Sequence, residues 1–152
     1  PVQYAAHVIR EVVAQQKNLD PAEVEDVNVG CAWPEGPTGF NVARIASMVA
    51  GLPEATAAVT VNRFCSSSSQ AVMMAANQIV MNGVDIAVGA GVETITMMQD
   101  GTSNSNRLFN AEASERFPGL YFSMGRTAEI VAERYGVSRE DQDVYGLQSQ
   151  QR

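Results

Sequence analysis

A cysteine stands where a buried strand is expected to give way to a helix, and it is the clearest candidate for chemistry in the sequence. The β-branched, apolar run at 57–62 predicts the strand, and the serines after Cys65 begin a long apolar helix that Gly83 ends. The N–H groups and dipole of a helix N-terminus favour a thiolate, and they can also bind the oxyanion that forms on an attacked carbonyl. Cys65 is therefore a candidate nucleophile for acyl transfer, with a buried packing cysteine as the alternative.

The other residues that could take part in catalysis or binding lie in positions that support such a role less well. Cys31 ends a predicted strand that no helix follows directly, so packing explains it better than catalysis, and two cysteines without further ligands do not predict a zinc site. His7, the only histidine, lies on a predicted helix far from Cys65 in sequence; a Cys–His pair is an open alternative, but a structural histidine is favoured. The glycines at 83–91 do not form a nucleotide-binding loop.

The chain around Cys65 alternates helix and strand signals. Apolar spacing, caps and β-branched runs predict a helix at 4–16, a helix start at 20–23, a strand at 27–32, a loop at 33–39, a helix at 41–50, a strand at 57–62, a helix at 66–82 and a strand at 85–91. This order predicts βαβ units and a largely parallel sheet, and hence an α/β fold. The helix at 66–82 is apolar on nearly every side, so we expect neighbouring elements to enclose it.

The texture of the sequence changes after about residue 97. A polar stretch rich in asparagine is followed by two predicted helices, at 125–135 and 138–152, the second with Ser138 as its cap and Asp141 at the matching position. We therefore expect an α/β core at 1–97 and the beginning of a separate, helical subdomain at 98–152.

Composition and charge exclude several classes of function. The 152 residues hold 17 acids and 10 bases, a net charge of −7 that argues against nucleic acid or an anionic membrane as the main partner. There is no apolar run long enough to predict a membrane span, and two cysteines do not predict a disulfide framework. Neither end of the sequence carries the usual start or stop signals, so we expect the chain to be part of a longer one.

Four segments, in order, resemble motifs of the thiolases, the acetyl-CoA acyltransferases. They are 61–67 (VNRFCSS, followed by Gln70 and Ala71), 89–96 (GAGVETIT), 124–129 (MGRTAE) and the pair 138–143 (SREDQD) and 149–152 (SQQR). The first resembles the nucleophile motif of the family, the second its glycine-rich strand and turn, and the third its Met-Gly-x-Thr-Ala-Glu segment. The resemblance covers nearly the whole chain.

The resemblance implies a layered βαβαβ fold and specific roles for two residues. Residues 1–97 would be the incomplete N-terminal α/β core, and 98–152 the first part of an inserted loop domain that covers the active site and binds coenzyme A. Cys65 would take an acyl group from acyl-CoA as a thioester, with its backbone N–H contributing to an oxyanion hole, and Met124 would line the acyl and CoA pocket. The strand at 57–62 would lie by the interface of a homodimer or homotetramer. Apart from coenzyme A as substrate, no cofactor and no metal is implied.

Three departures from the family pattern qualify these expectations. The family usually has Gly-Leu where this sequence has Ser68 and Ser69, so we expect a different pocket shape or acyl preference. Ser123 stands where some biosynthetic members carry histidine, which favours a degradative or specialised 3-ketoacyl thiolase over the acetoacetyl-CoA type. Thiolytic cleavage of a 3-ketoacyl-CoA and the reverse Claisen condensation both stay open. The family's Gly-His-Pro, Asn-Glu and Cys-x-Gly motifs do not occur within the 152 residues, so we expect the chain alone to be inactive.

Two other functions are compatible with these residues. One is a condensing enzyme of the β-ketoacyl synthase type, which the third and fourth motifs fit less well. The other is a thiolase-like module without catalysis that binds lipid or dimerises. The expected compartment is the cytoplasm in a bacterium, and the mitochondrion or peroxisome in a eukaryote.

Overall fold

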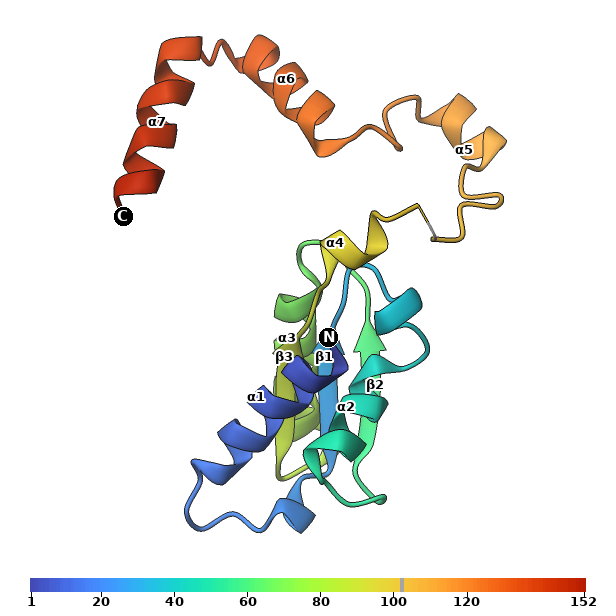
Figure 1. The fold of residues 1–152 in the computed structure, drawn as a ribbon, viewed down its shortest axis with the longest axis vertical. Coiled ribbons are helices and arrows are strands. Elements are labelled where there is room, and N and C mark those ends of the chain that lie inside the picture. The colour runs from blue at the N-terminus through green and yellow to red at the C-terminus, as the bar shows by residue number, and fades with distance from the viewer. Residues whose placement is uncertain (102) are drawn as a thin grey trace. The chain divides into compact units, whose positions relative to one another are not determined.

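In the computed structural model, which describes residues 1–101 and 103–152, the chain divides into two compact units, Pro1–Asn104 and Ser105–Arg152. The first unit is built on three parallel strands, β1 (Asp26–Gly30), β2 (Ala57–Val61) and β3 (Ala87–Gly91), in the order β2-β1-β3 (Figure 1). The predicted parallel α/β arrangement is confirmed. Because parallel strands all end at the same edge of a sheet, the chain segments that follow them meet there.

Two helices cover one face of the sheet and a third covers the other. Helices α1 (Val2–Ala14) and α2 (Val42–Ala50) share a core with β1, whose Val27 and Val29 are fully buried. Helix α3 (Ser67–Asn82) lies against the opposite face, behind the sheet in Figure 1. The alternation of side chains along β1 directs its valines to one layer and its remaining residues to α3.

The first layer is fixed by caps at the ends of α2. The Asn41 side chain accepts a hydrogen bond from the Arg44 N–H, and Gly51 ends the helix in the left-handed conformation (φ 91°), both as the sequence predicts. The Arg10 guanidinium of α1 donates to the carbonyls of Val49 and Ala50 at 2.8 and 3.2 Å. These bonds satisfy carbonyls that the end of a helix leaves unpaired.

The predicted helix start at 20–23 forms only one 3₁₀ turn, η1 (Pro21–Glu23). Asp20 and Glu23 make the expected capping box, but Val24 is extended and almost fully buried. The chain enters β1 at once, because burying Val24 in the core requires the helix to stop. A second 3₁₀ turn, η2 (Gly36–Thr38), lies in the loop that follows β1.

A polar chain links α3 to the central strand. The Asn28 amide donates to the Gln78 side-chain oxygen at 2.9 Å, and the Gln78 amide donates to an Asp26 carboxylate oxygen at 2.7 Å. Asn28 is fully buried. A buried polar group costs free energy unless it is hydrogen-bonded, so these bonds favour one axial position of α3 over others.

Helix α3 is enclosed on one face only in this chain, whereas the sequence predicts neighbours all round. Ala71 and Ala75 are buried against the sheet. Five large apolar side chains on the remaining surface are exposed: Val72, Met73, Ile79, Val80 and Met81. The first unit therefore carries an apolar helix face that no described residue of that unit covers.

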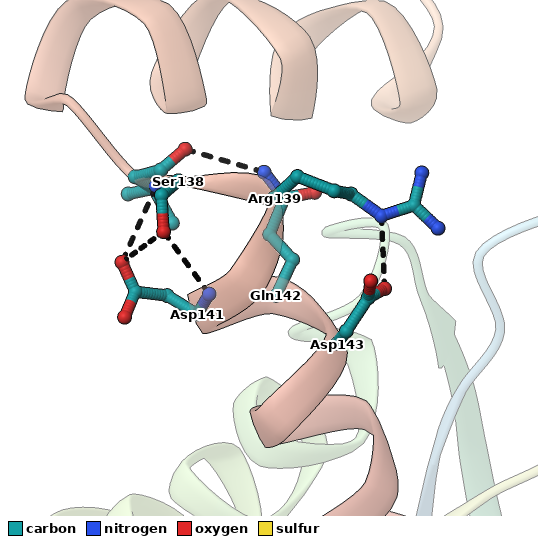
Figure 2. Close-up of polar contacts among 6 residues, drawn as sticks. Ser138, Arg139, Asp141, Gln142 and Asp143 are labelled. Atoms are coloured by element: carbon teal, nitrogen blue, oxygen red, sulfur yellow. Dashed lines mark hydrogen bonds and ion pairs between the residues drawn. The ribbon is translucent and has the colours of Figure 1, made fainter.

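The second unit is helical. After the short helix α4 (Ile95–Met98) of the first unit come α5 (Ala111–Arg116), α6 (Met124–Tyr135) and α7 (Arg139–Gln151). Figure 2 shows the start of α7, where Ser138 and Asp141 form the predicted capping box and Arg139 pairs with Asp143 at 2.8 Å. No helix among the described residues is long and apolar enough to cross a membrane.

Candidate active site

A tight turn between β2 and α3 presents Cys65. Phe64, directly before it, has a positive φ of 47°, which is unusual for a residue with a side chain. The Asn62 side chain accepts from the Phe64 N–H at 2.9 Å. The Ser67 hydroxyl accepts from the Arg63 N–H at 2.9 Å and donates to the Phe64 carbonyl at 2.5 Å. Two side chains from either side of Cys65 thus hold the backbone in this conformation.

The thiol of Cys65 is exposed, immediately before the first turn of α3. Ser66 is the N-cap residue, but its side chain makes no capping hydrogen bond. The sequence prediction of a cysteine at a strand-to-helix junction is therefore confirmed in position. The buried packing role, which was the alternative, does not fit an exposed thiol.

Cys65 lies on a depression at the carboxyl ends of β1 and β3, with a volume of about 380 Å³. Its lining comes from the turn, from α3 and from the segments that follow the two strands. The lining residues are Gly30, Ala32, Phe64, Cys65, Ser67, Ser68, Gly91, Val92, Glu93 and Ile95. A thiol, hydroxyls, one carboxylate and apolar side chains therefore share one concave surface.

Two glycines let the first turn of α3 approach the sheet. A Cβ added to Gly30 would lie 2.3 Å from backbone atoms of Ser67 and Ser68. A Cβ added to Gly91 would lie 1.9 Å from the Ser68 hydroxyl oxygen. The hydroxyl of Ser68 thus fills the space above Gly91 at the floor of the depression.

Glu93 joins the segments that follow β1 and β3. Its carboxylate accepts from the Ala32 N–H at 2.7 Å and from the Thr94 N–H at 3.3 Å. The thiol of Cys31 faces the same carboxylate at 3.8 Å. Cys31 is buried, and burial raises the pKa of its thiol, with the nearby Glu93 carboxylate adding to the effect. Cys31 is therefore a packing residue, as the sequence predicts.

The remaining predicted residues lie away from this depression. His7 is exposed on α1, which belongs to the layer opposite α3, and it does not line the depression. Met124 begins α6 in the second unit, where it is exposed and borders a groove of about 390 Å³. Val131 of α6, Val137 of the connection between α6 and α7, and Gln142 of α7 also line this groove. Its predicted place in an acyl pocket stays a prediction. In the part of the chain that the structure describes, no cluster of side chains is suited to hold a metal ion.

Sequence reasoning gave no role to two residues of the site. The sequence predicts Ser67 only as one of the serines that begin a helix, whereas its hydroxyl bridges two backbone groups of the turn. Glu93 lies inside a recognised motif, but its partner Ala32 is 61 residues away. The resemblance of 89–96 to a glycine-rich strand and turn is the one signal in the sequence near Glu93, and it assigns Glu93 no role.

Comparison with known proteins places this site in context. The family described as "Thiolase, N-terminal domain" matches residues 2–152. A 3-ketoacyl-CoA thiolase of Bacillus subtilis is 43% identical over 131 residues, which is 84% of this chain and 32% of the relative. Another from Aliivibrio salmonicida is 37% identical over 148 residues, 97% of this chain and 38% of that protein. The chain thus spans about a third of the length of these relatives.

Proposed function

This chain belongs to the thiolase family, and on that premise we propose that the whole protein is an acyltransferase that cleaves 3-ketoacyl-CoA. The name of the relatives supports the substrate class. The observation that carries the proposal is the placement of Cys65: an exposed thiol, on a turn held by hydrogen bonds, at the start of α3 and on a concave surface.

In the proposed reaction the Cys65 thiolate attacks the 3-keto carbon of the substrate. The bond between C2 and C3 then breaks, and its electron pair stays with the two-carbon fragment, which takes up a proton and leaves as acetyl-CoA. The shortened acyl group remains on Cys65 as a thioester. The sulfur of a second coenzyme A attacks that thioester, its proton passes to a base, and Cys65 is released.

The first turn of α3 supports this chemistry. The backbone N–H groups at its N-terminus favour the negative charge that develops on the attacked oxygen. We expect the groups that move protons to come from the remainder of the protein, since this chain matches only 32% and 38% of the two relatives. The proposed chemistry needs no metal or redox cofactor.

The test is acylation of Cys65 itself. The full-length protein is incubated with acetyl-CoA, and the modified residue is located by mass spectrometry of its peptides. We expect one acetyl group on Cys65 and none in the Cys65→Ala variant, with Cys31→Ala as the matched control that still reacts. An acetyl group on a different residue in the parent protein would sink the assignment.

A second test concerns the 152-residue chain by itself. We expect it to show no thiolysis of a 3-ketoacyl-CoA, because thiolysis needs proton transfer as well as the nucleophile. The assay follows loss of the 3-ketoacyl-CoA and release of acetyl-CoA, with the full-length protein as positive control. Turnover by the short chain at a rate comparable to the full-length protein would contradict the proposed division of the site.

We also propose that the full-length protein is a homodimer or homotetramer. Strand β2 lies at an edge of the three-stranded sheet, and its outer side pairs with no described strand. An edge strand readily pairs with another chain. Sedimentation of the full-length protein measures the oligomeric state directly, and a monomer across the accessible concentration range would refute the proposal.

Because the relatives named above are bacterial, we propose the cytoplasm as the compartment.

A further inference from the structure

The two walls of the depression on which Cys65 lies are joined by one carboxylate. Strands β1 and β3 end side by side, with Gly30 opposite Gly91, and the chain leaves each strand into a separate segment. Ala32 lines the depression from the first segment, and Ile95 lines it from the second. These two segments are far apart in sequence, so the sheet alone does not fix the distance between them beyond the last paired residues.

Glu93 makes the connection with both of its oxygens. One accepts from the Ala32 N–H of the first segment at 2.7 Å, and the other from the Thr94 N–H of its own segment at 3.3 Å. The Cys31 thiol approaches the second oxygen at 3.8 Å. A charged acceptor makes stronger hydrogen bonds than a neutral one, and two bonds to different segments restrict their separation as well as their orientation.

We propose that Glu93 is a positioning residue for acyl transfer: its carboxylate holds the Ala32 wall and the Ile95 wall at the width that admits an acyl thioester to Cys65. The inference rests on the proposed function. It assigns Glu93 no contact with the reacting atoms; Glu93 acts through Ala32 and Thr94. An acyl-CoA needs the shaped depression, whereas a small alkylating reagent needs only an accessible thiolate at Cys65.

The test therefore compares two reactions of the same sulfur in the full-length protein. Acylation of Cys65 by acetyl-CoA and its alkylation by iodoacetamide are measured for Glu93→Ala and Glu93→Gln. We expect Glu93→Ala to slow acylation by roughly tenfold to a hundredfold, the scale of loss that follows misplacement of a reacting group, and to leave alkylation within about twofold. Glu93→Gln keeps an oxygen for the Ala32 N–H, so it should recover most of the acylation rate.

Glu25 provides a matched control at the opposite ends of the same strands. Its carboxylate accepts from the Asp85 N–H at 2.7 Å, also across a long stretch of sequence, and it does not line the depression. Glu25→Ala changes the net charge by the same amount and removes a similar bond. It should leave the ratio of acylation to alkylation unchanged, even if it lowers the melting temperature.

The outcomes separate this inference from the proposed function. No acylation of Cys65 in the parent protein overturns both. Acylation in the parent with an unchanged ratio in Glu93→Ala overturns the positioning role alone, as does an equal fall of acylation and alkylation. If Glu93→Ala does not fold, Glu93→Asp decides, because it keeps the charge but shortens the reach to the Ala32 N–H. A ratio of acylation to alkylation clearly below the parent's supports positioning, and an unchanged ratio contradicts it.

Discussion

At the residue scale, the position of Cys65 depends on its neighbours more than on contacts of its own. Phe64 holds a left-handed backbone conformation that costs a residue with a side chain on the order of 1–3 kcal/mol. Asn62 and Ser67 provide the hydrogen bonds that stabilise this conformation. The strained backbone at Phe64 therefore persists because the hydrogen bonds around it stabilise that conformation.

Replacement of Ser67 by alanine should weaken this turn. The change removes the acceptor for the Arg63 N–H and the donor to the Phe64 carbonyl, and Ser67 is nearly fully buried. We expect a loss of about 1–3 kcal/mol in the free energy of unfolding, measured with urea, together with slower acylation of Cys65. Ser69→Ala is the control, because Ser69 is exposed and takes part in neither of these hydrogen bonds. Equal stability of the two variants would contradict the bridging role.

The pKa of Cys31 gives a second prediction at this scale. Burial raises the pKa of this thiol, so the folded chain keeps a proton that the unfolded chain releases. The contribution of this protonated thiol to the free energy of unfolding is fully present below the pKa of the unfolded thiol, about 8.5. That contribution is lost as the pH rises through the higher pKa of the folded state. Cys31→Ala should reduce the alkaline loss of unfolding free energy.

The measurement is urea unfolding at several pH values between about 7 and 10, with Cys65→Ala as control. Only the slope with pH is compared, because removing a buried side chain also lowers stability at every pH. A slope in Cys31→Ala as steep as in the parent chain would show that another group governs the alkaline range.

At the element scale, the close approach of α3 to the sheet depends on which atoms face the glycines of β1 and β3. Above Gly30 lie backbone atoms of Ser67 and Ser68, which cannot be removed by substitution. Above Gly91 lies the Ser68 side chain. Replacing Ser68 by glycine should therefore relieve the loss of stability caused by alanine at Gly91 but not the loss caused by alanine at Gly30.

A double-mutant cycle tests this difference. Gly91→Ala should destabilise the first unit by about 1–3 kcal/mol through overpacking, and adding Ser68→Gly should recover much of that loss, since the next nearest atom is then the Gly30 carbonyl oxygen at 3.5 Å. Gly30→Ala should not be recovered by Ser68→Gly. Thermal or urea unfolding of the six proteins gives the coupling, and equal recovery at the two glycines would contradict the packing described.

Ser68→Gly alone should change the acyl preference of the site. Removing the hydroxyl above Gly91 opens space at the floor of the depression. We expect the rate of Cys65 acylation by a bulkier acyl-CoA to rise relative to acetyl-CoA by roughly tenfold, the lower end of what one small group is worth in an apolar pocket. Ser69→Ala is the control, and an unchanged ratio of rates would place Ser68 outside the acyl path.

Local signals in the sequence predict most of the elements but little of what joins them. Asn41 and Gly51 bound α2, and Gly83 ends α3, because caps act within one turn. The capping box at Asp20 is equally clear, yet its helix stops after one turn because Val24 belongs to the core. The position of Cys65 follows from local pattern, whereas the bond between Glu93 and Ala32 connects distant segments and has no sequence signature.

At the scale of the whole molecule, the two units differ in how they bury their side chains. The first has a continuous apolar core between the sheet and α1 and α2. None of α5, α6 and α7 in the second contains a buried residue. Their contacts include caps, exposed ion pairs such as that between Arg139 and Asp143, and the Arg126 guanidinium 3.9 Å from the centre of the Phe122 ring. Exposed pairs of this kind contribute little.

Amide hydrogen exchange of the 152-residue chain should reflect this contrast. We expect the amides of β1 to exchange slowest, because the strand is paired on both sides and its valines are fully buried. The amides of α6 and α7 should exchange faster, close to the rate of an isolated helix. Equal protection of β1 and α7 would indicate that the second unit is stabilised by contacts other than those described.

The hydrogen bonds from Asn28 to Gln78 and from Gln78 to Asp26 hold α3 at one position along its axis. A helix packed mainly through small side chains against glycine-bearing strands could slide along its axis at low cost, but Gln78 meets both of its partners at one position. The next equivalent position along a helix is a full turn away, about 5.4 Å. Cys65 directly precedes the N-terminal end of α3, whereas Gln78 lies near its C-terminal end. Motion of Cys65 along that axis should therefore be stepwise rather than graded, and small strains at the far end of α3 should be stopped before they reach the sulfur.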